Sequence, residues 1–350
     1  MIAETRVASK GEVMAKVTDV AKKANVSAAI VSRLLNEDPT LRIRDETRAR
    51  VWQAASDLDY TPNFAARALR TSSSGAVGFA VHDASNPIYS AVIAGAQAEA
   101  TAAGYALMLA DVDALAEGGN VFRRMISSGA IDGLLMQRAG TTSDSFVSKL
   151  AAQRMPIVFL NDRTEGEISS VGVDDYGASL MATQHLVELG HRKIGFLQVD
   201  GPRVRSERRH QGWLDALTNA GLELNPRFVV SGGHTADDGY AGMKKMLASA
   251  EWPTALFAAN VLAGVGALTA CRDAGVIVPD EMSIVGLHDI PLAEYLAPRL
   301  TVARLPLFEM GARAISMLLE QLADGLPRHE TILHPLPVMV IRESTSAPSV

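Results

Sequence analysis

The chain has 350 residues, of which 48% are hydrophobic and 21% are charged, a mixture that can bury a large core and excludes a disordered or collagen-like protein. No run of 18 uncharged apolar residues occurs, and the first 25 residues lack the apolar stretch of a secretory signal, so neither a membrane span nor export is expected. The net charge of −6 is uneven, because residues 1–70 carry 12 Lys and Arg against 9 Asp and Glu while the remainder is acidic. A basic nucleic-acid module on an acidic body would give this balance, although chance is the alternative for so small an excess.

Two short helices are predicted near the amino terminus. Apolar residues recur at helical spacing over Thr18–Ala24, and Asn25 tolerates the left-handed conformation that ends a helix. Ser27 then offers an N-cap oxygen for a second helix, Ala28–Leu35, with one apolar stripe. Because only two or three residues separate the helices, they must cross steeply, which indicates a helix-turn-helix.

The second helix carries small or hydrogen-bonding side chains and one cation on the face opposite its apolar stripe. In a major groove, Ala28 and Ala29 could pack on a thymine methyl group, and Arg33 could bind the two acceptors of a guanine. Phosphate contacts are expected from Lys16, Ser27, Ser32 and Asn36. An ordinary solvated helix face is the alternative interpretation.

A third helix is predicted to begin at an Asp45 cap, to run to Leu58 and to close a small module with a thin core. The segment that follows, residues 63–70, is rich in helix-forming residues but too short to remain helical alone in water.

These motifs carry a family resemblance that extends over nearly the whole chain. The stretches DVAKKANVS (19–27), VSRLLN (31–36), YTPN (60–63) and ARALR (66–70) resemble the head and hinge of the lactose-repressor (LacI/GalR) family of bacterial transcription regulators. By that resemblance the last segment is a hinge helix that folds with its twin on operator DNA, where Leu69 would wedge into the minor groove and Arg70 would contact groove or phosphate. Asn63 and Ala66 would lie at the same DNA surface. The resemblance implies a disordered tail (1–15), a helix-turn-helix DNA-binding domain (16–62), a hinge helix and linker (63–74), and a two-lobed effector-binding and dimerisation domain (75–350).

From residue 75 onward, short apolar runs alternate with helical segments. This pattern predicts an α/β fold. Nine or so parallel strands exceed one comfortable doubly wound sheet, so two sheets are expected, with a break near 162–169. The resemblance implies a periplasmic-binding-protein-like body. The predicted strands are Val77–Val81, Ala106–Ala110, Gly133–Met136, Ile157–Leu160, Ser170–Val173, Ile194–Gln198, Phe228–Val230, Ala255–Ala258 and Ser283–Leu287.

Polar residues that follow these strands are the ligand candidates, since ligands of such sheets bind beyond the carboxyl ends of the strands. Arg209 and Trp213 add a cation and an aromatic plate at helical spacing. This mixture suits hydroxyl-rich ligands such as sugars, whereas helix caps and turns are the alternative for each residue taken singly. The family resemblance implies effector contacts by Asn86, Asn161, Arg209, Trp213, Asn260 and His288.

Three positions depart from the family pattern in this cleft. Asn161 and His288 stand where Asp is common, and Val261 follows Asn260 where Asp is usual. Fewer carboxylates therefore face the cleft, which puts a standard sugar inducer in doubt. His288 could make effector binding pH-sensitive, with a structural histidine as the alternative.

Two other function classes compete with a regulator. An enzyme would need catalytic apparatus, but the sequence contains no phosphate loop, serine elbow or metalloprotease motif, and the glycines of residues 264–269 fall within a predicted helix. The single cysteine, Cys271, excludes a cysteine metal site and fits a reducing cytosol. A cytosolic solute-binding protein would share the two-lobed body but not the basic head.

The sequence therefore predicts a cytosolic DNA-binding transcription regulator, with repression the expected mode, controlled by a small metabolite, a sugar or related molecule, in the body's cleft. One head buries too little surface for tight binding, so a homodimer on a palindromic operator is expected, with the helix near Ile88–Ala103 as the candidate dimer contact. No catalytic residue, metal or cofactor is predicted. The alternative is a solute-binding protein or enzyme with the same α/β body.

Overall fold

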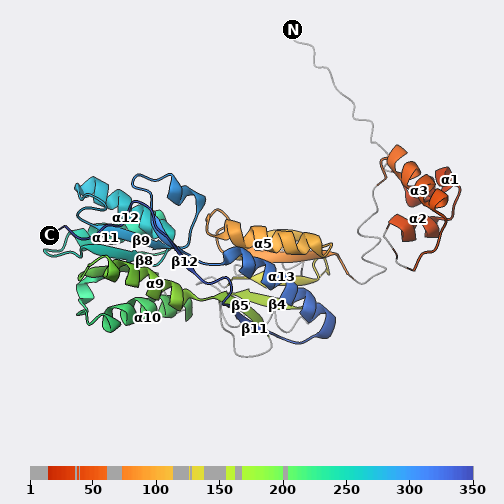
Figure 1. The fold of residues 1–350 in the computed structure, drawn as a ribbon. Coiled ribbons are helices and arrows are strands. Elements are labelled where there is room, and N and C mark those ends of the chain that lie inside the picture. The colour runs from red at the N-terminus through yellow and green to blue at the C-terminus, as the bar shows by residue number, and fades with distance from the viewer. Residues whose placement is uncertain are drawn as a thin grey trace, which may run out of the picture. The chain divides into compact units, whose positions relative to one another are not determined.

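The computed structural model describes residues 15–35, 38, 40–60, 73–112, 126, 128–137, 155–161, 168–199 and 204–349. Contacts between Cα atoms divide the chain into two compact units, Met1–Ser74 and Gly75–Val350 (Figure 1). Each unit is described by itself.

In its described residues the first unit contains three helices, α1 (Val17–Ala24), α2 (Ala28–Leu35) and α3 (Asp45–Asp57). Asn25 ends α1 in the left-handed conformation, with φ of 55°, and the Ser27 hydroxyl accepts a hydrogen bond from the Ile30 N–H at 3.4 Å. The tight connection and the Ser27 cap follow the sequence prediction. In contrast, Asp45 is the first residue of α3 and Arg44 holds the cap position. Buried residues from all three helices form a small core, which comprises Val20, Ala21, Ala24, Val31, Leu34, Val51, Ala54 and Ala55.

The second unit is built on two six-stranded sheets in the part of the chain that the structure describes. The first sheet is parallel, in the order β11-β5-β4-β3-β1-β2, and the second has the order β12-β10-β9-β8-β6-β7, in which β12 is antiparallel to its neighbour. The first sheet comprises β1 (Ala76–Val81), β2 (Ala106–Asp111), β3 (Gly133–Met136), β4 (Ile157–Leu160), β5 (Ser169–Val173) and β11 (His329–Ile332). The second comprises β6 (Ile194–Gln198), β7 (Val229–Ser231), β8 (Ala255–Ala258), β9 (Ser283–Leu287), β10 (Thr301–Arg304) and β12 (Val338–Val340).

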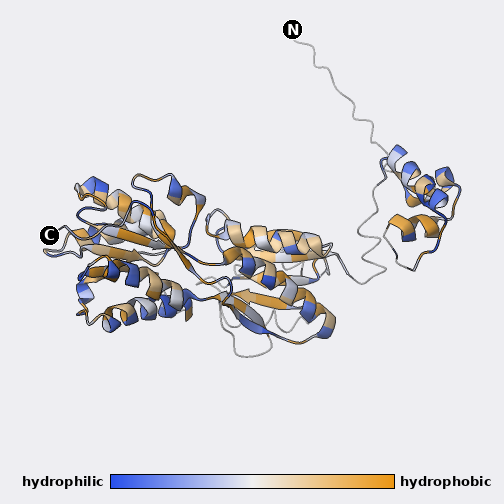
Figure 2. Cartoon of the chain, viewed as in Figure 1, coloured by the Kyte–Doolittle hydropathy of each residue, from blue (hydrophilic) through white to orange (hydrophobic). Residues whose placement is uncertain are grey.

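Paired helices cover the sheets. α5 (Tyr89–Ala102) packs on α13 (Leu307–Asp324) at the first sheet. At the second sheet α9 (Asp175–Glu188) packs on α10 (Val204–Asn219), and α11 (Ala236–Leu247) on α12 (Val261–Ala274). Short 3-10 turns occur at Pro226–Phe228 and Pro291–Glu294. Hydrophobic residues gather in the strands and hydrophilic residues on the outer faces of the helices (Figure 2). No helix in the described ranges is long and apolar enough to cross a membrane.

The chain passes between the two sheets after β5, after β10 and after β11. The predicted break near 162–169 is therefore wrong, because Ser169 begins β5, which pairs in parallel with β4 in the first sheet. The polar stretch before Ser169 has the composition of a linker but connects two neighbouring strands. The nine predicted strands are confirmed within a residue or so at each end, whereas β10, β11 and β12 were missed.

Glycines allow α11 and α12 to pack closely against each other. A Cβ atom at Gly266 would overlap the backbone carbonyl oxygen of Ala236, and one at Gly239 would overlap the carbonyl oxygen of Ala263. Backbone atoms cannot rotate away, so a methyl group here must push the helices apart.

We expect Gly266→Ala to lower the free energy of unfolding by about 1–3 kcal/mol, the usual cost of overpacking. Gly264→Ala is the matched control in the same helix, since its added methyl group would approach the Leu300 side chain at 3.2 Å and would otherwise meet Ala258 and Gly286 only at ordinary van der Waals distances. Its cost should be largely offset by the better helix propensity of alanine, which is worth about 1 kcal/mol. Urea denaturation of both variants measures the difference, and equal losses would contradict the packing argument.

Candidate functional site

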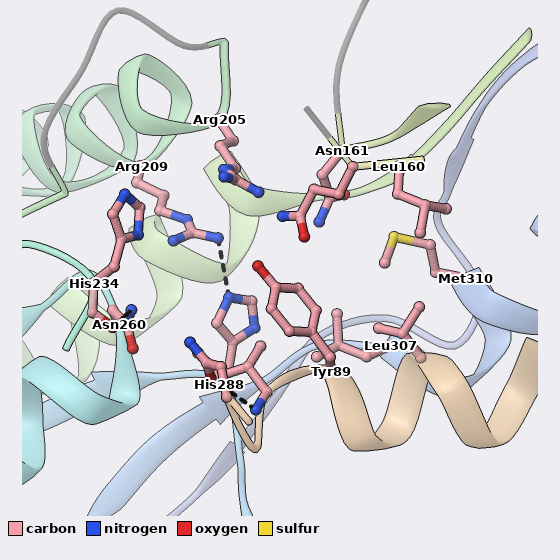
Figure 3. Close-up of a pocket in the computed structure, with 14 residues that line it drawn as sticks. Tyr89, Leu160, Asn161, Arg205, Arg209, His234, Asn260, His288, Leu307 and Met310 are labelled. Carbon is pink, nitrogen blue, oxygen red and sulfur yellow. Dashed lines mark hydrogen bonds between the residues drawn. The ribbon is translucent and has the colours of Figure 1, made fainter. Parts of the chain in front are cut away.

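A cavity of about 50 Å³ lies in the second unit, where the carboxyl ends of strands from both sheets meet. Gln137 and Asn161 follow β3 and β4 of the first sheet, and Asn260 and His288 follow β8 and β9 of the second. The described lining residues are Asn86, Ile88, Tyr89, Val92, Gln137, Leu160, Asn161, Arg205, Arg209, His234, Asn260, His288, Leu307 and Met310 (Figure 3). Both sheets thus contribute residues to one cavity.

Arg209 is the most buried cation of the cavity, with 5% of its surface exposed. Its Nε donates to Asp175 Oδ1 at 2.7 Å, and its Nη1 donates to the Ala259 carbonyl oxygen at 2.8 Å. Its Nη2 lies 3.0 Å from His288 Nε2. One guanidinium group therefore links α9 with the ends of β8 and β9, all in the lobe built on the second sheet (the second lobe).

The Arg209 contact decides the protonation of His288. A guanidinium nitrogen can only donate, so His288 Nε2 must accept and the ring proton must reside on Nδ1. Burial first, and then the charges of Arg209 and Arg205, hold the pKa of His288 well below its usual range. The imidazole is neutral at neutral pH, and its buried Nδ1 has no partner among the described residues. His288 is thus a neutral hydrogen-bond donor rather than a group that titrates near pH 7.

The three asparagines have structural contacts in addition to their place at the cavity. Asn161 Oδ1 accepts from the Val173 N–H at 3.1 Å, and Asn86 Oδ1 accepts from the Ile88 N–H at 3.1 Å. Asn260 caps α12 through the Leu262 N–H at 2.8 Å, while its Nδ2 donates to a backbone carbonyl group at 3.1 Å. The sequence offered two interpretations of Asn260, a helix cap and a residue of the cavity wall. The structure shows both.

The structure does not bring Trp213 to the cavity. The indole is 2% exposed and stacks on Phe196 at 5.3 Å and on His210 at 5.7 Å between ring centroids. Trp213 lies one helical turn beyond Arg209 on α10, so it covers the sheet rather than the strand ends. The other five predicted effector residues line the cavity.

Two lining residues with basic side chains were missed from the sequence. Arg205 precedes Arg209 by one turn of α10, and His234 follows β7. The strand-end rule that selected Asn260 would have found His234. Leu307 and Met310 come from α13, whose return to the first lobe no local pattern predicts.

Metal and thiol chemistry find no support in the described part of the chain. No group of three or more His, Cys, Asp or Glu residues there could hold a metal ion. Burial raises the pKa of the Cys271 thiol to about 12, which keeps it protonated.

The exposed face of α2 presents the predicted DNA contacts of the first unit. Ser27 and Ala29 are exposed, and Ala28, Ser32 and Arg33 are half-buried. Lys16, at the cap of α1, donates its backbone N–H to Asp19 Oδ2 at 2.8 Å and is exposed. The predicted contacts Asn36, Asn63, Ala66, Leu69 and Arg70 lie outside the described residues.

Arg33 is held by its own neighbours in this structure. Its Nε donates to Asp38 Oδ2 at 2.8 Å, and its Nη2 donates to Thr40 Oγ1 at 2.8 Å. Hydrogen bonds from Thr40 and then from Arg33 lower the pKa of Asp38 to about 2, so the carboxylate is ionised at neutral pH. These two contacts use two of the five guanidinium N–H groups.

Comparison with known proteins gives matches to both units. Residues 16–63 match the family of bacterial regulatory proteins called the lacI family, and residues 183–345 match the periplasmic binding protein-like domain. The chain is 30% identical over 333 residues to the HTH-type transcriptional repressor PurR of Mannheimia succiniciproducens. The aligned region covers 95% of this chain and 98% of the relative.

Two solved structures show the same architecture. The lac repressor dimer bound to operator and the anti-inducer ONPF is 25% identical, with a TM-score of 0.78 over 95% of this chain and 99% of that one. The complex of the transcriptional regulator CelR with cellobiose is 27% identical, with a TM-score of 0.70 over 94% of this chain and 99% of that one.

Proposed function

The chain belongs to the LacI family of bacterial regulatory proteins, and we propose that the cavity between its two lobes is the sensor that sets the affinity of its helix-turn-helix for operator DNA. Membership in this family makes the chain a DNA-binding transcriptional repressor and not an enzyme. It acts as a dimer on operator DNA and responds to a small effector.

The observation that carries the sensor assignment is that both lobes line the same cavity. Asn161 and Tyr89 approach from the first lobe, and Arg209 and His288 from the second (Figure 3). A ligand that contacts both lobes favours the lobe arrangement that it fits, and it shifts the protein only by its difference in affinity for the two arrangements. CelR is a relative solved with cellobiose, which supports a sugar or a related metabolite as the class of effector.

The domain boundaries proposed from the sequence suit this function. We assign residues 16–62 to DNA binding, 63–74 to a hinge helix and linker, and 75–350 to effector binding and dimerisation, after a tail of 1–15. α5 is the proposed dimer contact. Because its relatives are DNA-binding repressors, the protein is proposed to work in the cytoplasm. Direct DNA contacts are assigned to Lys16, Ser27, Ala28, Ala29, Ser32, Arg33, Asn36, Asn63, Ala66, Leu69 and Arg70.

The test is fluorescence anisotropy of the full chain on labelled fragments from the region upstream of its own gene. We expect binding that weakens as salt rises, because phosphate contacts release counterions. A panel of sugars, sugar acids, sugar phosphates, polyols and purines should contain a compound that changes the affinity about 5- to 150-fold, the usual range of allosteric coupling. An unrelated fragment of equal length is the control. Equal affinity for every fragment, with no response to any compound, would contradict the proposal.

A further inference from the structure

We propose that the ion pair between Asp289 and Arg304 stabilises the lobe arrangement seen in this structure and breaks when the lobes rearrange. The inference rests on the proposed function, in which the lobe arrangement carries the signal of the cavity. Asp289 touches no effector in this scheme and acts as a positioning residue. Three observations carry the inference: the place of the pair on the chain, its link to the cavity, and the different exposure of the two arginines that bind Asp289.

Asp289 binds two arginines from different strands of the second sheet. Its Oδ2 accepts from Arg304 Nη2 at 2.7 Å and from Arg304 Nε at 3.0 Å. Arg342 Nη2 donates to Oδ1 at 3.0 Å and to Oδ2 at 3.1 Å, while Arg342 Nη1 donates to the Leu300 carbonyl oxygen at 2.8 Å. One carboxylate after β9 therefore joins the end of β10 to the segment that follows β12.

Arg304 lies where two of the three passages between the sheets meet the second sheet. It is the last residue of β10, after which the chain passes to α13. It also pairs with Val338, the first residue of β12, which the chain reaches from β11. Hinge motions are usually absorbed by a few residues at the ends of elements, so bending of both passages begins beside this pair. One groove is lined by Asp289, Arg304 and residues of both passages, namely Leu305, Pro306, Pro335 and Leu336.

The residue before Asp289 belongs to the cavity. His288 lines the cavity and has a left-handed backbone, with φ of 73°, which few residues other than glycine adopt. Its backbone N–H donates to the Ala303 carbonyl oxygen of β10 at 2.9 Å, and its ring accepts from Arg209 (Figure 3). Arg209 also binds Asp175, at the start of α9 directly after the third passage. Consecutive contacts therefore connect the cavity with all three passages, and a ligand that displaces His288 also displaces Asp289.

The two arginines that bind Asp289 differ in exposure. The side chains of Asp289 and Arg342 are each 11% exposed, whereas that of Arg304 is 53% exposed. A buried pair is hard to break because the remaining charge has no partner, whereas water readily replaces one partner of an exposed pair. Arg342 thus anchors Asp289, and the contact with Arg304 can open. After opening, Asp289 retains Arg342 and Arg304 enters water, so no buried charge is left unpaired.

The distance between the lobes can be measured by pulsed electron spin resonance of the full chain without DNA. Spin labels would be attached at Ala323→Cys on α13 and Lys245→Cys on α11, both at exposed positions, and the buried Cys271 would be left in place. An excess of unlabelled chain restricts the measured distance to one protomer. We expect Arg304→Gln to lower the ratio of the original distance to other distances about two- to fivefold, the change that loss of an exposed ion pair can produce. Arg304→Lys should retain most of the original population, and Arg304→Glu, which repels Asp289, should shift it further than Arg304→Gln.

Arg299 provides the matched control in the same lobe. Its side chain is 53% exposed, like that of Arg304, and its Nη2 lies at the same distance of 2.7 Å from the carboxylate of Glu343. This pair lies at the other end of β10, away from the two passages, so Arg299→Gln and Arg299→Glu should leave the distance distribution unchanged. Circular dichroism and size-exclusion chromatography check that each variant is folded and dimeric. An unchanged distribution in folded Arg304→Glu, or equal shifts in the Arg299 and Arg304 series, would overturn the inference.

The same variants separate this inference from the proposed function. The label distance is measured without DNA or effector, so it reports the lobe arrangement alone. Anisotropy then gives the operator affinity of each variant. A shift of the lobes without a change in operator affinity would contradict the sensor assignment and leave the role of Asp289 and Arg304 intact.

Discussion

Replacing Arg209 by alanine is expected to lower the free energy of unfolding of the second unit by about 3–5 kcal/mol. The side chains of Arg209 and Asp175 are only 6% and 3% exposed, so the carboxylate would remain buried without its cation. The Ala259 carbonyl oxygen and His288 Nε2 would also lose their donor. Leaving buried polar groups unpaired costs far more than the net value of the bonds that are lost.

The exposed pair Arg299–Glu343 is the matched control for this prediction. It has the same nitrogen-to-oxygen distance of 2.7 Å as Arg209–Asp175, but its side chains are 53% and 50% exposed. Arg299→Ala should therefore cost far less stability than Arg209→Ala, because water screens the exposed pair. Urea denaturation followed by circular dichroism measures both variants, and similar losses would show that burial does not set the energy of the Arg209 pair.

A large loss of stability also limits what Arg209 can reveal about the effector. A variant that unfolds partly will lose its effector response whether or not Arg209 touches the ligand. Arg205, which is half-buried and also lines the cavity, provides the cleaner test of effector binding. Arg209→Lys would keep the charge but not the planar fork that reaches three partners, so it should recover part of the stability.

Strands that are buried along their whole length could be predicted from the sequence because their apolar runs are local signals. Ile157–Leu160 and Ala255–Ala258 are such runs, and each coincides with an observed strand. The strands that were missed lack this signal. His329–Ile332 is largely exposed at the edge of the first sheet, and Thr301–Arg304 ends on an exposed arginine. Their pairing depends on partners far away in the sequence, which no local pattern contains.

The path of the chain between the sheets could not be read from composition. A polar stretch before Ser169 looks like a boundary between domains, yet β4 and β5 on either side of it are hydrogen-bonded neighbours. The first true passage follows Val173, where Asp174 caps α9 by accepting from the Gly177 N–H at 3.0 Å. A cap of this kind begins many helices, so it does not mark a change of sheet.

The candidate site was predictable where topology alone decides it. Residues that follow parallel strands meet at one edge, and this rule placed Asn161, Asn260 and His288 at the cavity. Site residues on helices were harder to predict, because the position of a residue along the helix axis matters as well as the face on which it lies. Arg209 and Trp213 share a face of α10, but one turn of about 5.4 Å separates the cavity from the core.

Replacing Arg33 by alanine is expected to weaken operator binding by about 1–3 kcal/mol for each half-site and to relax the base preference at one position. The substitution is present in both heads of a dimer, so the total loss would be about twice as large where the two sites are independent. Anisotropy on operators that differ at single base pairs measures both effects. A residue that only attracts phosphates would weaken all sequences alike.

Asp38 separates base recognition by Arg33 from a purely structural role. In the structure Arg33 donates to Asp38 and Thr40, so the carboxylate holds the guanidinium group and offsets part of its positive charge. If Arg33 reads a base, Asp38→Asn should strengthen operator binding and keep the base preference, because it removes a negative charge near the phosphates. If Arg33 serves only to fix the loop at Thr40, Asp38→Asn should weaken binding as Arg33→Ala does. The two variants must therefore move operator affinity in opposite directions for the base-reading role of Arg33 to hold.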